Sequence, residues 1–202
     1  MPVAFTKVIG EHQIIGLWLV ETQKIIRRVG NSAALVGYEA SHSEACRSLL
    51  KAMTGIDNLT ILKDEFGKPF IQNSKDFISF SHSGSYAAAV INQQQSVGID
   101  IQQKKDKILS LAAKFCSYEE LNYINQVDTI PMLHIIWCAK EAMFKQYGKG
   151  AVLFKEHIFV HPFELATKGE LTVTFKKDNE ETFRFAYECH EEYYLVYSAC
   201  YL

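Results

Sequence analysis

Alternating apolar and polar positions mark several short stretches of this chain as β-strands. Successive side chains of a strand point to opposite faces of a sheet, so a period of two favours a half-buried strand. The pattern predicts strands at Gln13–Val20, Phe77–Ser83, Tyr86–Ile91, Val97–Ile101, Leu171–Phe175, Thr182–Glu188 and Tyr193–Tyr201. Short polar turns connect the three consecutive strands between Phe77 and Ile101, which therefore predict an antiparallel meander.

Helical spacing of apolar residues alternates with these strands. It predicts helices at Thr22–Val29, Ser43–Met53, Ile108–Phe115, Glu119–Asn125 and Met132–Tyr147. Gly55 and Gly148 are natural stops for the second and the last of them. Because the order of helix then strands occurs twice with no linker-like stretch, we expect an α+β fold of two pseudo-symmetric halves, residues 1–95 and 96–202. Each half would be an antiparallel sheet with packed helices, and the active site would lie in the cleft between them.

Composition narrows the classes of protein. The formal net charge of -2 argues against a general nucleic-acid or membrane binder, because such binding draws on accumulated Lys and Arg. The five cysteines are odd in number and contain no Cys-x-x-Cys pair, which disfavours disulfide or zinc frameworks and favours a reduced cytoplasm. The longest early apolar stretch, Ile14–Val20, is too short to cross a bilayer. We expect a cytoplasmic protein and a monomer.

The segment from Val97 to Lys145 carries the candidate chemistry. Asp100 ends an apolar strand, where a carboxylate stays ionised only with water, a cation or hydrogen-bond donors nearby. Glu141 continues a helical stripe that begins apolar, and Lys145 lies one turn beyond it. Together these residue types can hold a magnesium ion against a pyrophosphate. Singly, each has a plainer interpretation: a strand-end Asp that starts a turn, and a surface Glu-Lys pair worth about 0.3–0.5 kcal/mol.

Two neighbouring residues extend this set. Gln102 shares a strand face with Asp100, so its amide oxygen could reach a cation directly or through water. Glu120 follows Ser117 by three residues, which is a capping-box pattern and predicts a helix start. A Glu in that position can also accept a proton if a metal and a phosphate lie nearby.

Upstream residues are candidate phosphate contacts. Gly67-Lys68-Pro69 places a cation in a restricted turn, and Ser81-His82 ends a strand with a hydroxyl and an imidazole. Arg47 lies within a predicted helix, where it is either a solvated residue or a forked ligand for phosphate. The motifs typical of nucleotide hydrolases, dehydrogenases, serine hydrolases and zinc proteases do not occur in the sequence.

Five short motifs occur in a fixed order, and the set resembles the 4′-phosphopantetheinyl transferase superfamily, of the Sfp (surfactin-synthetase-activating) type. The motifs are Gly67-Lys68-Pro69, Phe80-Ser81-His82-Ser83, Val97-Gly98-Ile99-Asp100-Ile101, Phe115 to Glu120, and Trp137-x-x-Lys140-Glu141-Ala142-x-x-Lys145. The resemblance implies an enzyme that moves the 4′-phosphopantetheine arm of coenzyme A onto a serine of an apo acyl carrier protein or carrier domain. Adenosine 3′,5′-bisphosphate would be the second product.

The resemblance also implies roles for the residues of the second half. Asp100 and Glu141 would hold Mg²⁺, Glu120 would help to deprotonate the acceptor serine, and Lys145 would steady the pyrophosphate. Many family members carry an acid where this chain has Gln102, so one metal ligand is weakened or replaced by water.

For the first half the resemblance implies contacts with the donor. Lys68, Pro69, Ser81 and His82 would hold the phosphates of coenzyme A, and Arg47 would contact the 3′-phosphate. Two alternatives stay open: a non-catalytic protein that binds coenzyme A or a carrier protein on the same scaffold, and a transferase that uses these acids for another pyrophosphate donor. The sequence does not decide between carriers of fatty acid, polyketide or nonribosomal peptide synthesis.

Overall fold

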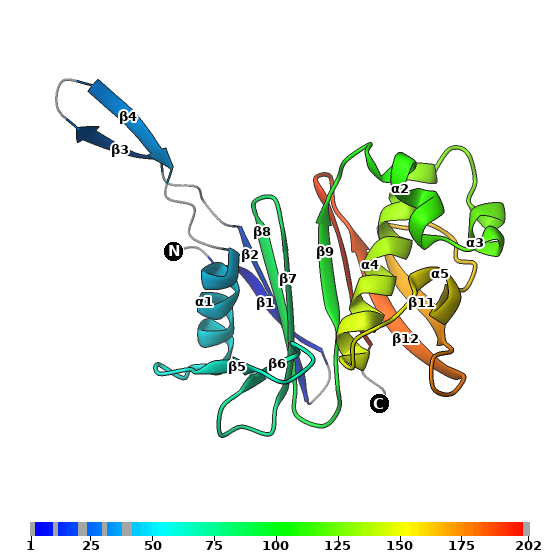
Figure 1. Cartoon of the computed structure of the whole chain (residues 1–202), viewed down its shortest axis with the longest axis horizontal. Helices are drawn as coiled ribbons and strands as arrows, with labels where there is room; N and C mark the ends of the chain where they lie inside the picture. Colours follow the sequence, from blue (N-terminus) through cyan, green and yellow to red (C-terminus); the bar gives the residue numbers. More distant parts are fainter. Residues whose placement is uncertain (1–2, 10–11, 20–23, 30–31, 38–41, 200–202) are drawn as a thin grey trace.

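Two antiparallel sheets face each other, and each is covered by helices on its outer side (Figure 1). The computed structural model describes residues 3–9, 12–19, 24–29, 32–37 and 42–199. The α+β class and the two similar halves that the sequence predicts are confirmed. Within the described part of the chain, no helix is both long and apolar enough to cross a membrane.

The first sheet has six strands. Their order is β1 (Val3–Ile9), β2 (Gln13–Leu19), β8 (Tyr86–Asn92), β7 (Phe77–Ser83), β6 (Pro69–Ile71) and β5 (Ile61–Lys63). Helix α1 (His42–Thr54) packs on its outer face through the buried Leu49 and Leu50. Ala87 and Ala89 of β8 lie beneath this helix, and their small side chains allow a close approach of helix and sheet.

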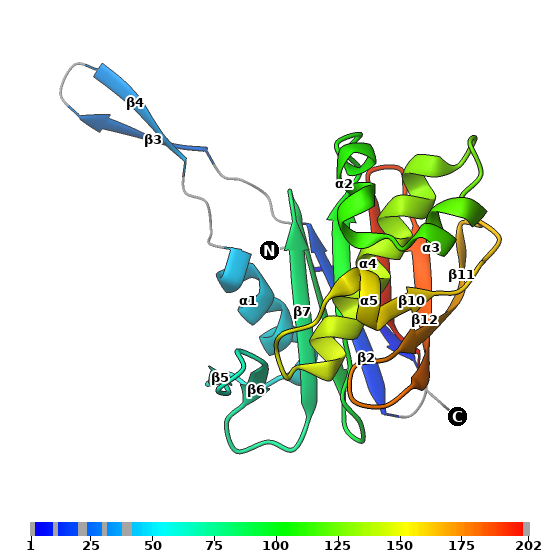
Figure 2. The same cartoon turned by 45° about the vertical axis from the view of Figure 1, so that its right-hand side comes forward.

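The second sheet has five strands. Their order is β10 (Ile158–Val160), β11 (Lys168–Phe175), β12 (Glu181–Cys189), β13 (Tyr193–Ser198) and β9 (Ile99–Gln103). Its outer face carries the helices α2 (Ile108–Phe115), α3 (Tyr118–Tyr123), α4 (Thr129–Tyr147) and α5 (Phe154–His157) (Figure 2). Helix α4 is the longest of these and ends at Gly148, whose φ of 68° is the left-handed conformation that glycine adopts freely.

A separate hydrophobic cluster lies between the two sheets. From the first sheet it takes residues of β2 and β8, among them Ile15 and Val90, and from the second it takes residues of β9 and β13, among them Ile101 and Leu195. The two halves therefore share a core instead of meeting only at their surfaces.

The predicted meander is wrong in its third strand. Strands β7 and β8 pair as expected, but β9 pairs with β13 in the second sheet. Both edges of β8 are already taken, by β2 and β7, and β7 lies between β8 and β6. The strand that precedes β9 in the sequence therefore has no free edge, and β9 pairs with the C-terminal strand β13 instead.

The helix predicted at Thr22–Val29 is also wrong. Lys24–Val29 is strand β3, which pairs with β4 (Ser32–Gly37) in a two-stranded sheet. Its Ile25 and Ile26 are β-branched, which favours a strand, and its pairing partner follows directly in the sequence. Thr22 and Gln23 lie outside the described residues, as do the predicted strand ends at Val20 and at 200–201.

Candidate active site

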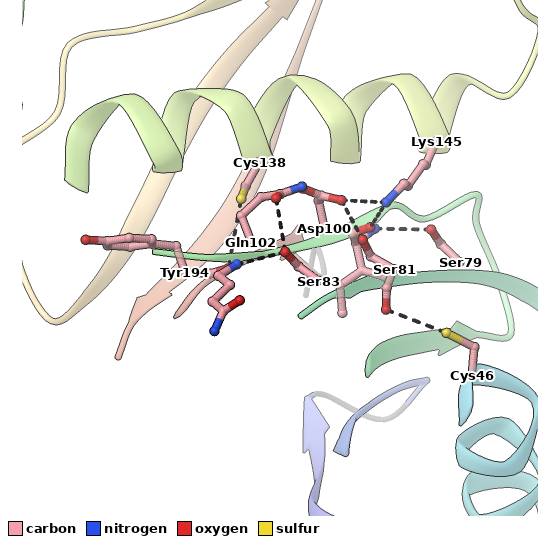
Figure 3. A network of polar contacts seen from close by, with 11 residues as sticks. Cys46, Ser79, Ser81, Ser83, Asp100, Gln102, Cys138, Lys145 and Tyr194 are labelled. Carbon is pink, nitrogen blue, oxygen red and sulfur yellow. Dashed lines mark hydrogen bonds and ion pairs between the residues drawn. The ribbon is translucent and has the colours of Figure 1, made fainter. Parts of the chain in front are cut away.

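Three serines of β7 point toward β9 and join the two sheets (Figure 3). They are Ser79, Ser81 and Ser83, and we call them the serine ladder. The N–H of Ile99 donates to Ser79 at 3.2 Å, and the N–H of Gln103 donates to Ser83 at 3.0 Å. The hydroxyl of Ser81 donates to Asp100 at 2.6 Å. Serine hydroxyls thus accept two N–H groups on the edge of β9 that faces away from β13.

Asp100 lies at the centre of the contacts between the serine ladder and β9. It lies on β9, is only 2% exposed, and its Oδ1 accepts hydrogen bonds from Ser81 and from Lys145. The Lys145 Nζ lies 2.6 Å from this oxygen and 3.0 Å from the carbonyl of Ile99. A carboxylate this deeply buried needs polar partners, and here a cation and a hydroxyl group supply them.

Glu141 lies one helical turn before Lys145 on α4 and is partly buried. Burial and, to a smaller extent, the negative charge of Asp100 together raise the pKa of its carboxyl to about 7, while the charge of Lys145 opposes the shift. Asp100 thus lies near enough to Glu141 for its charge to act on that carboxyl.

These two carboxylates suit Mg²⁺, which binds one or two carboxylates and keeps several waters. Burial and the charge of Asp100 both disfavour the ionised form of Glu141, and the charge of a divalent cation would offset both effects. A larger set of three or more His, Cys, Asp or Glu side chains able to hold a metal does not occur among the described residues. The residues present therefore fit Mg²⁺ with water-completed coordination rather than zinc.

Gly98 allows the strand that carries Asp100 to touch the helix that carries Glu141. A Cβ atom at this position would lie 1.8 Å from the carbonyl oxygen of Ala142. Only glycine permits this approach of β9 to α4. The sequence showed Gly98 within a motif without revealing this role.

Gln102 lies on the same side of β9 as Asp100, as the strand alternation predicts. Its Nε2 donates to Asp100 Oδ2 at 3.3 Å, and its Oε1 accepts from Ser83 at 3.2 Å. The structure therefore brings together Asp100, Gln102 and Ser81 with Glu141 and Lys145.

Glu120 occupies a different environment. The predicted capping box is confirmed, because Glu120 accepts from the N–H of Ser117 while its own N–H donates to the Ser117 hydroxyl. The side chain is fully buried, with Oε2 2.7 Å from Lys140 and Oε1 2.8 Å from the N–H of Val160. Both oxygens are engaged in buried contacts, so this conformation does not present Glu120 as an exposed base.

Lys140 belongs to the last of the five sequence motifs, but its contacts were not predicted. Besides Glu120, its buried Nζ donates to the carbonyl oxygens of Phe115, Phe154 and Ile158 at 2.7–3.0 Å. Burial lowers its pKa, and the charge of Glu120 opposes that shift. The position of Lys140, four residues after the buried Ile136 on α4, is the signal that could have revealed a buried lysine in need of a partner.

Lys68 links the halves at another point. Its Nζ donates to Ser96 Oγ at 2.6 Å and to the carbonyl of Gln146 at 2.7 Å, and burial lowers its pKa. Asp64 fixes the preceding turn by accepting the N–H of Lys68 at 2.8 Å. A Cβ at Gly148 would lie 2.3 Å from the Lys68 side chain, so this glycine makes room for it.

A pocket of about 190 Å³ lies beside these contacts, between the halves. Three lysines line it together with aromatic, small and proline residues, and its lining contains no carboxylate: Lys63, Phe66, Gly67, Lys68, Pro69, Ser79, Phe80, Phe144, Lys145, Gly148 and Gly150. This arrangement of cations favours an anionic group.

The two remaining predicted donor contacts lie apart from this pocket. His82 is exposed on the face of β7 opposite Ser81, and Arg47 is exposed on α1. Neither residue lines the pocket described above. Their predicted roles stay predictions.

The fold and the site define a two-sheet α+β protein that holds a pair of carboxylates beside a lysine-lined pocket. Residues 96–198 match the family model of the 4′-phosphopantetheinyl transferase superfamily, and the chain belongs to this superfamily. The matched region includes Asp100, Glu120, Glu141 and Lys145.

Individual relatives agree with this placement. A 4′-phosphopantetheinyl transferase of Bacillus subtilis is 29% identical over 139 residues, which cover 67% of this chain and 60% of the relative. The 4′-phosphopantetheinyl transferase Sfp of Bacillus subtilis (strain 168) is 26% identical over 159 residues, covering 76% and 69%. The 4′-phosphopantetheinyl transferase gsp of Aneurinibacillus migulanus is 27% identical over 128 residues, covering 62% and 51%. The chain thus spans between about half and two thirds of these relatives.

Proposed function

We propose that this protein transfers the 4′-phosphopantetheine arm of coenzyme A to a serine of an apo carrier protein and releases adenosine 3′,5′-bisphosphate. The observation that carries the proposal is the joint position of Asp100, Glu141 and Lys145 at the junction of the halves, within the region that matches the superfamily. A protein that only binds its ligand does not need two carboxylates whose charges act on each other.

Asp100 and Glu141 would hold Mg²⁺, which when bound supplies positive charge for the pyrophosphate and its leaving phosphate. Lys145 contacts Asp100 and also lines the pocket, so its ammonium group can pass from the carboxylate to a phosphate oxygen. Its charge would then favour the transition state, in which the bond to the leaving phosphate breaks.

The first half would bind the donor. Lys68 and Pro69 line the pocket, and the hydroxyl of Ser81 donates to Asp100 at 2.6 Å. We assign donor phosphate contacts to these residues and to His82, and the 3′-phosphate contact to Arg47. In this proposal residues 1–95 hold the donor and residues 96–202 supply the metal ligands and the catalytic Glu.

The acceptor serine must lose its proton, and Glu120 is the base that the family motif assigns. Its burial against Lys140 means that this role requires the ion pair to open when the substrates bind. A retained role in catalysis predicts that Glu120→Gln abolishes transfer without unfolding the protein. A purely structural role predicts that the variant transfers at the normal rate once folded.

The direct test is intact-protein mass spectrometry of apo acyl carrier proteins incubated with this protein, coenzyme A and Mg²⁺. We expect a mass gain of one phosphopantetheine, its loss in Asp100→Ala, and its retention in the exposed control Lys51→Ala. Carriers from fatty acid, polyketide and nonribosomal peptide synthesis should be compared, because the site does not distinguish them. No gain on any of them overturns the proposal.

Gln102 stands where many family members have an acid, and its amide nitrogen already donates to Asp100. This favours one alternative: a protein that binds coenzyme A or a carrier without transfer. Calorimetry separates the two functions. Coenzyme A binding that is independent of Mg²⁺ and yields no product supports the alternative, and competition by adenosine triphosphate would point to another donor.

We further propose that the protein acts as a monomer in the cytoplasm; the free thiols Cys46, Cys116, Cys138 and Cys189 suit a reducing compartment.

A further inference from the structure

The hydrogen bonds around Gln102 have a direction that the donors impose. A hydroxyl group carries one proton and two lone pairs. Ser83 accepts the backbone N–H of Gln103 at 3.0 Å, so its own proton is available for Gln102 Oε1 at 3.2 Å. The amide of Gln102 is thereby oriented with Nε2 toward Asp100 Oδ2, at 3.3 Å (Figure 3).

This relay holds Asp100 from a second side. Ser81 and Lys145 contact Oδ1, and Gln102 contacts Oδ2, so both carboxylate oxygens have donors that fix the plane of the group. The oxygen of Gln102 is engaged by Ser83 on the neighbouring sheet. Its nitrogen, which faces Asp100, has no lone pair with which to bind a cation.

We propose that Gln102 is a positioning residue for Asp100 rather than a metal ligand, and that Ser83 sets its orientation across the junction of the two sheets. The proposal rests on the proposed function for the identity of the cation. Groups that orient a metal ligand through a hydrogen bond commonly change metal affinity by about 10- to 100-fold. Ser83, which belongs to the other sheet, would then act on the metal site without touching the metal.

The test is calorimetry of magnesium chloride binding to the full chain, with and without coenzyme A. Ser83→Ala and Gln102→Leu should each weaken Mg²⁺ binding by about tenfold, and the double variant should weaken it no further, because both break the same relay. Ser83→Thr keeps the hydroxyl and should bind normally. The matched controls Ser110→Ala and Gln94→Leu change exposed residues outside the relay and should leave the affinity unchanged.

A direct ligand gives a different result. If Gln102 binds the ion through its oxygen, Gln102→Leu weakens binding while Ser83→Ala leaves it equal or stronger, since the oxygen is released. That pattern overturns the proposal.

A second measurement needs no metal and no activity. The side-chain amide signal of Gln102 in ¹⁵N-labelled protein should shift and exchange faster with water in Ser83→Ala, but not in Ser83→Thr; an unchanged signal in Ser83→Ala overturns the relay. The mass-spectrometry test is independent of this result. If Ser83→Ala and Gln102→Leu weaken Mg²⁺ binding without adding in the double variant, but the protein modifies no carrier, the relay stands and the proposed function fails. If the two losses add in a protein that does modify carriers, the proposed function stands and the relay fails.

Discussion

Glu141 is held in an environment that disfavours its charged form. Its pKa rises from an ordinary value of 4.5 to about 7 through burial and the nearby charge of Asp100. Between these two values the folded protein binds more protons than the unfolded chain, so this residue lowers the stability as the pH rises. The ionised carboxylate of Glu141 is therefore unfavourable in the folded protein, and a bound cation would compensate its charge.

Glu141→Gln should remove this cost. We expect the variant to be more stable than the parent by roughly 1–3 kcal/mol at pH 8, and the difference to disappear below about pH 4.5, where both forms are neutral. Urea unfolding without metal at pH 8 and pH 4.5 measures both values. A variant that is less stable than the parent at pH 8 contradicts this account of the site.

Lys140 and Glu120 form a fully buried ion pair, which is costly to break on one side only. Lys140→Met should destabilise the protein by about 3–5 kcal/mol, because Glu120 stays buried and loses its ion-pair partner. The double variant with Glu120→Gln should recover part of this loss. Urea midpoints measure the effect, with Lys176→Met as control: Lys176 forms an exposed pair with Glu180, and its loss should cost at most about 0.5 kcal/mol.

If Lys140→Met is no more destabilising than Lys176→Met, the pair opens readily, and the argument that Glu120 is sequestered is wrong. Such a result would strengthen the catalytic assignment of Glu120.

Local periodicity was sufficient to predict some contacts of the site and not others. Strand alternation predicts Gln102 beside Asp100, and a single helical turn predicts Lys145 beside Glu141. The pairing of Lys140 with Glu120 joins residues 20 apart through a loop and two helices. No local period encodes such a contact, because it depends on how the helices pack.

At the level of elements, the contact of β9 with α4 depends on Gly98. Gly98→Ala should cost about 1–3 kcal/mol of stability, since the new methyl group would collide with the carbonyl of Ala142. It should also weaken Mg²⁺ binding, because Asp100 and Glu141 are moved apart. Urea unfolding and magnesium calorimetry measure the two effects.

Gly55→Asn is the matched control. Gly55 has a positive φ of 68° at the end of α1 with no atom near its missing Cβ, and Asn tolerates this conformation. The control should change neither property. A Gly98→Ala protein that matches it in both would show that the strand and the helix can separate without effect on the site.

The elements themselves were predictable where a local signal dominates. Helix α2 has its predicted bounds, and α4 ends at the predicted Tyr147, before Gly148, although it begins at Thr129 instead of Met132. The sequence of Lys24–Val29 satisfies a helical spacing and a strand propensity at once, and only the pairing with β4 decides between them. The sheet that β9 joins depends on which strands still have an unpaired edge. That depends on how all the strands are arranged.

Across the whole molecule, buried polar groups reinforce the shared core between the sheets. Gln13 of β2 donates to the carbonyl of Ser198 at 2.8 Å and accepts from Asn92 at 3.0 Å. Lys68 joins the first half to the C-terminal end of α4 through Gln146. If the halves separated, the apolar cluster would be exposed and these polar groups would lose their partners. Each group that stayed out of contact with water would then cost about 1–3 kcal/mol.

The halves should therefore unfold together. The chain has two tryptophans, Trp18 in β2 and Trp137 in α4, so Trp18→Phe and Trp137→Phe leave one fluorescent probe in each half. In each variant we expect the urea midpoint from fluorescence to coincide with that from far-ultraviolet circular dichroism, which reports on both sheets, as in a two-state transition. A fluorescence midpoint of one half that precedes the dichroism midpoint of the same variant would show that this half unfolds independently. The contacts of the serine ladder with β9 and Asp100 would then join two stable units and would not be part of one cooperative core.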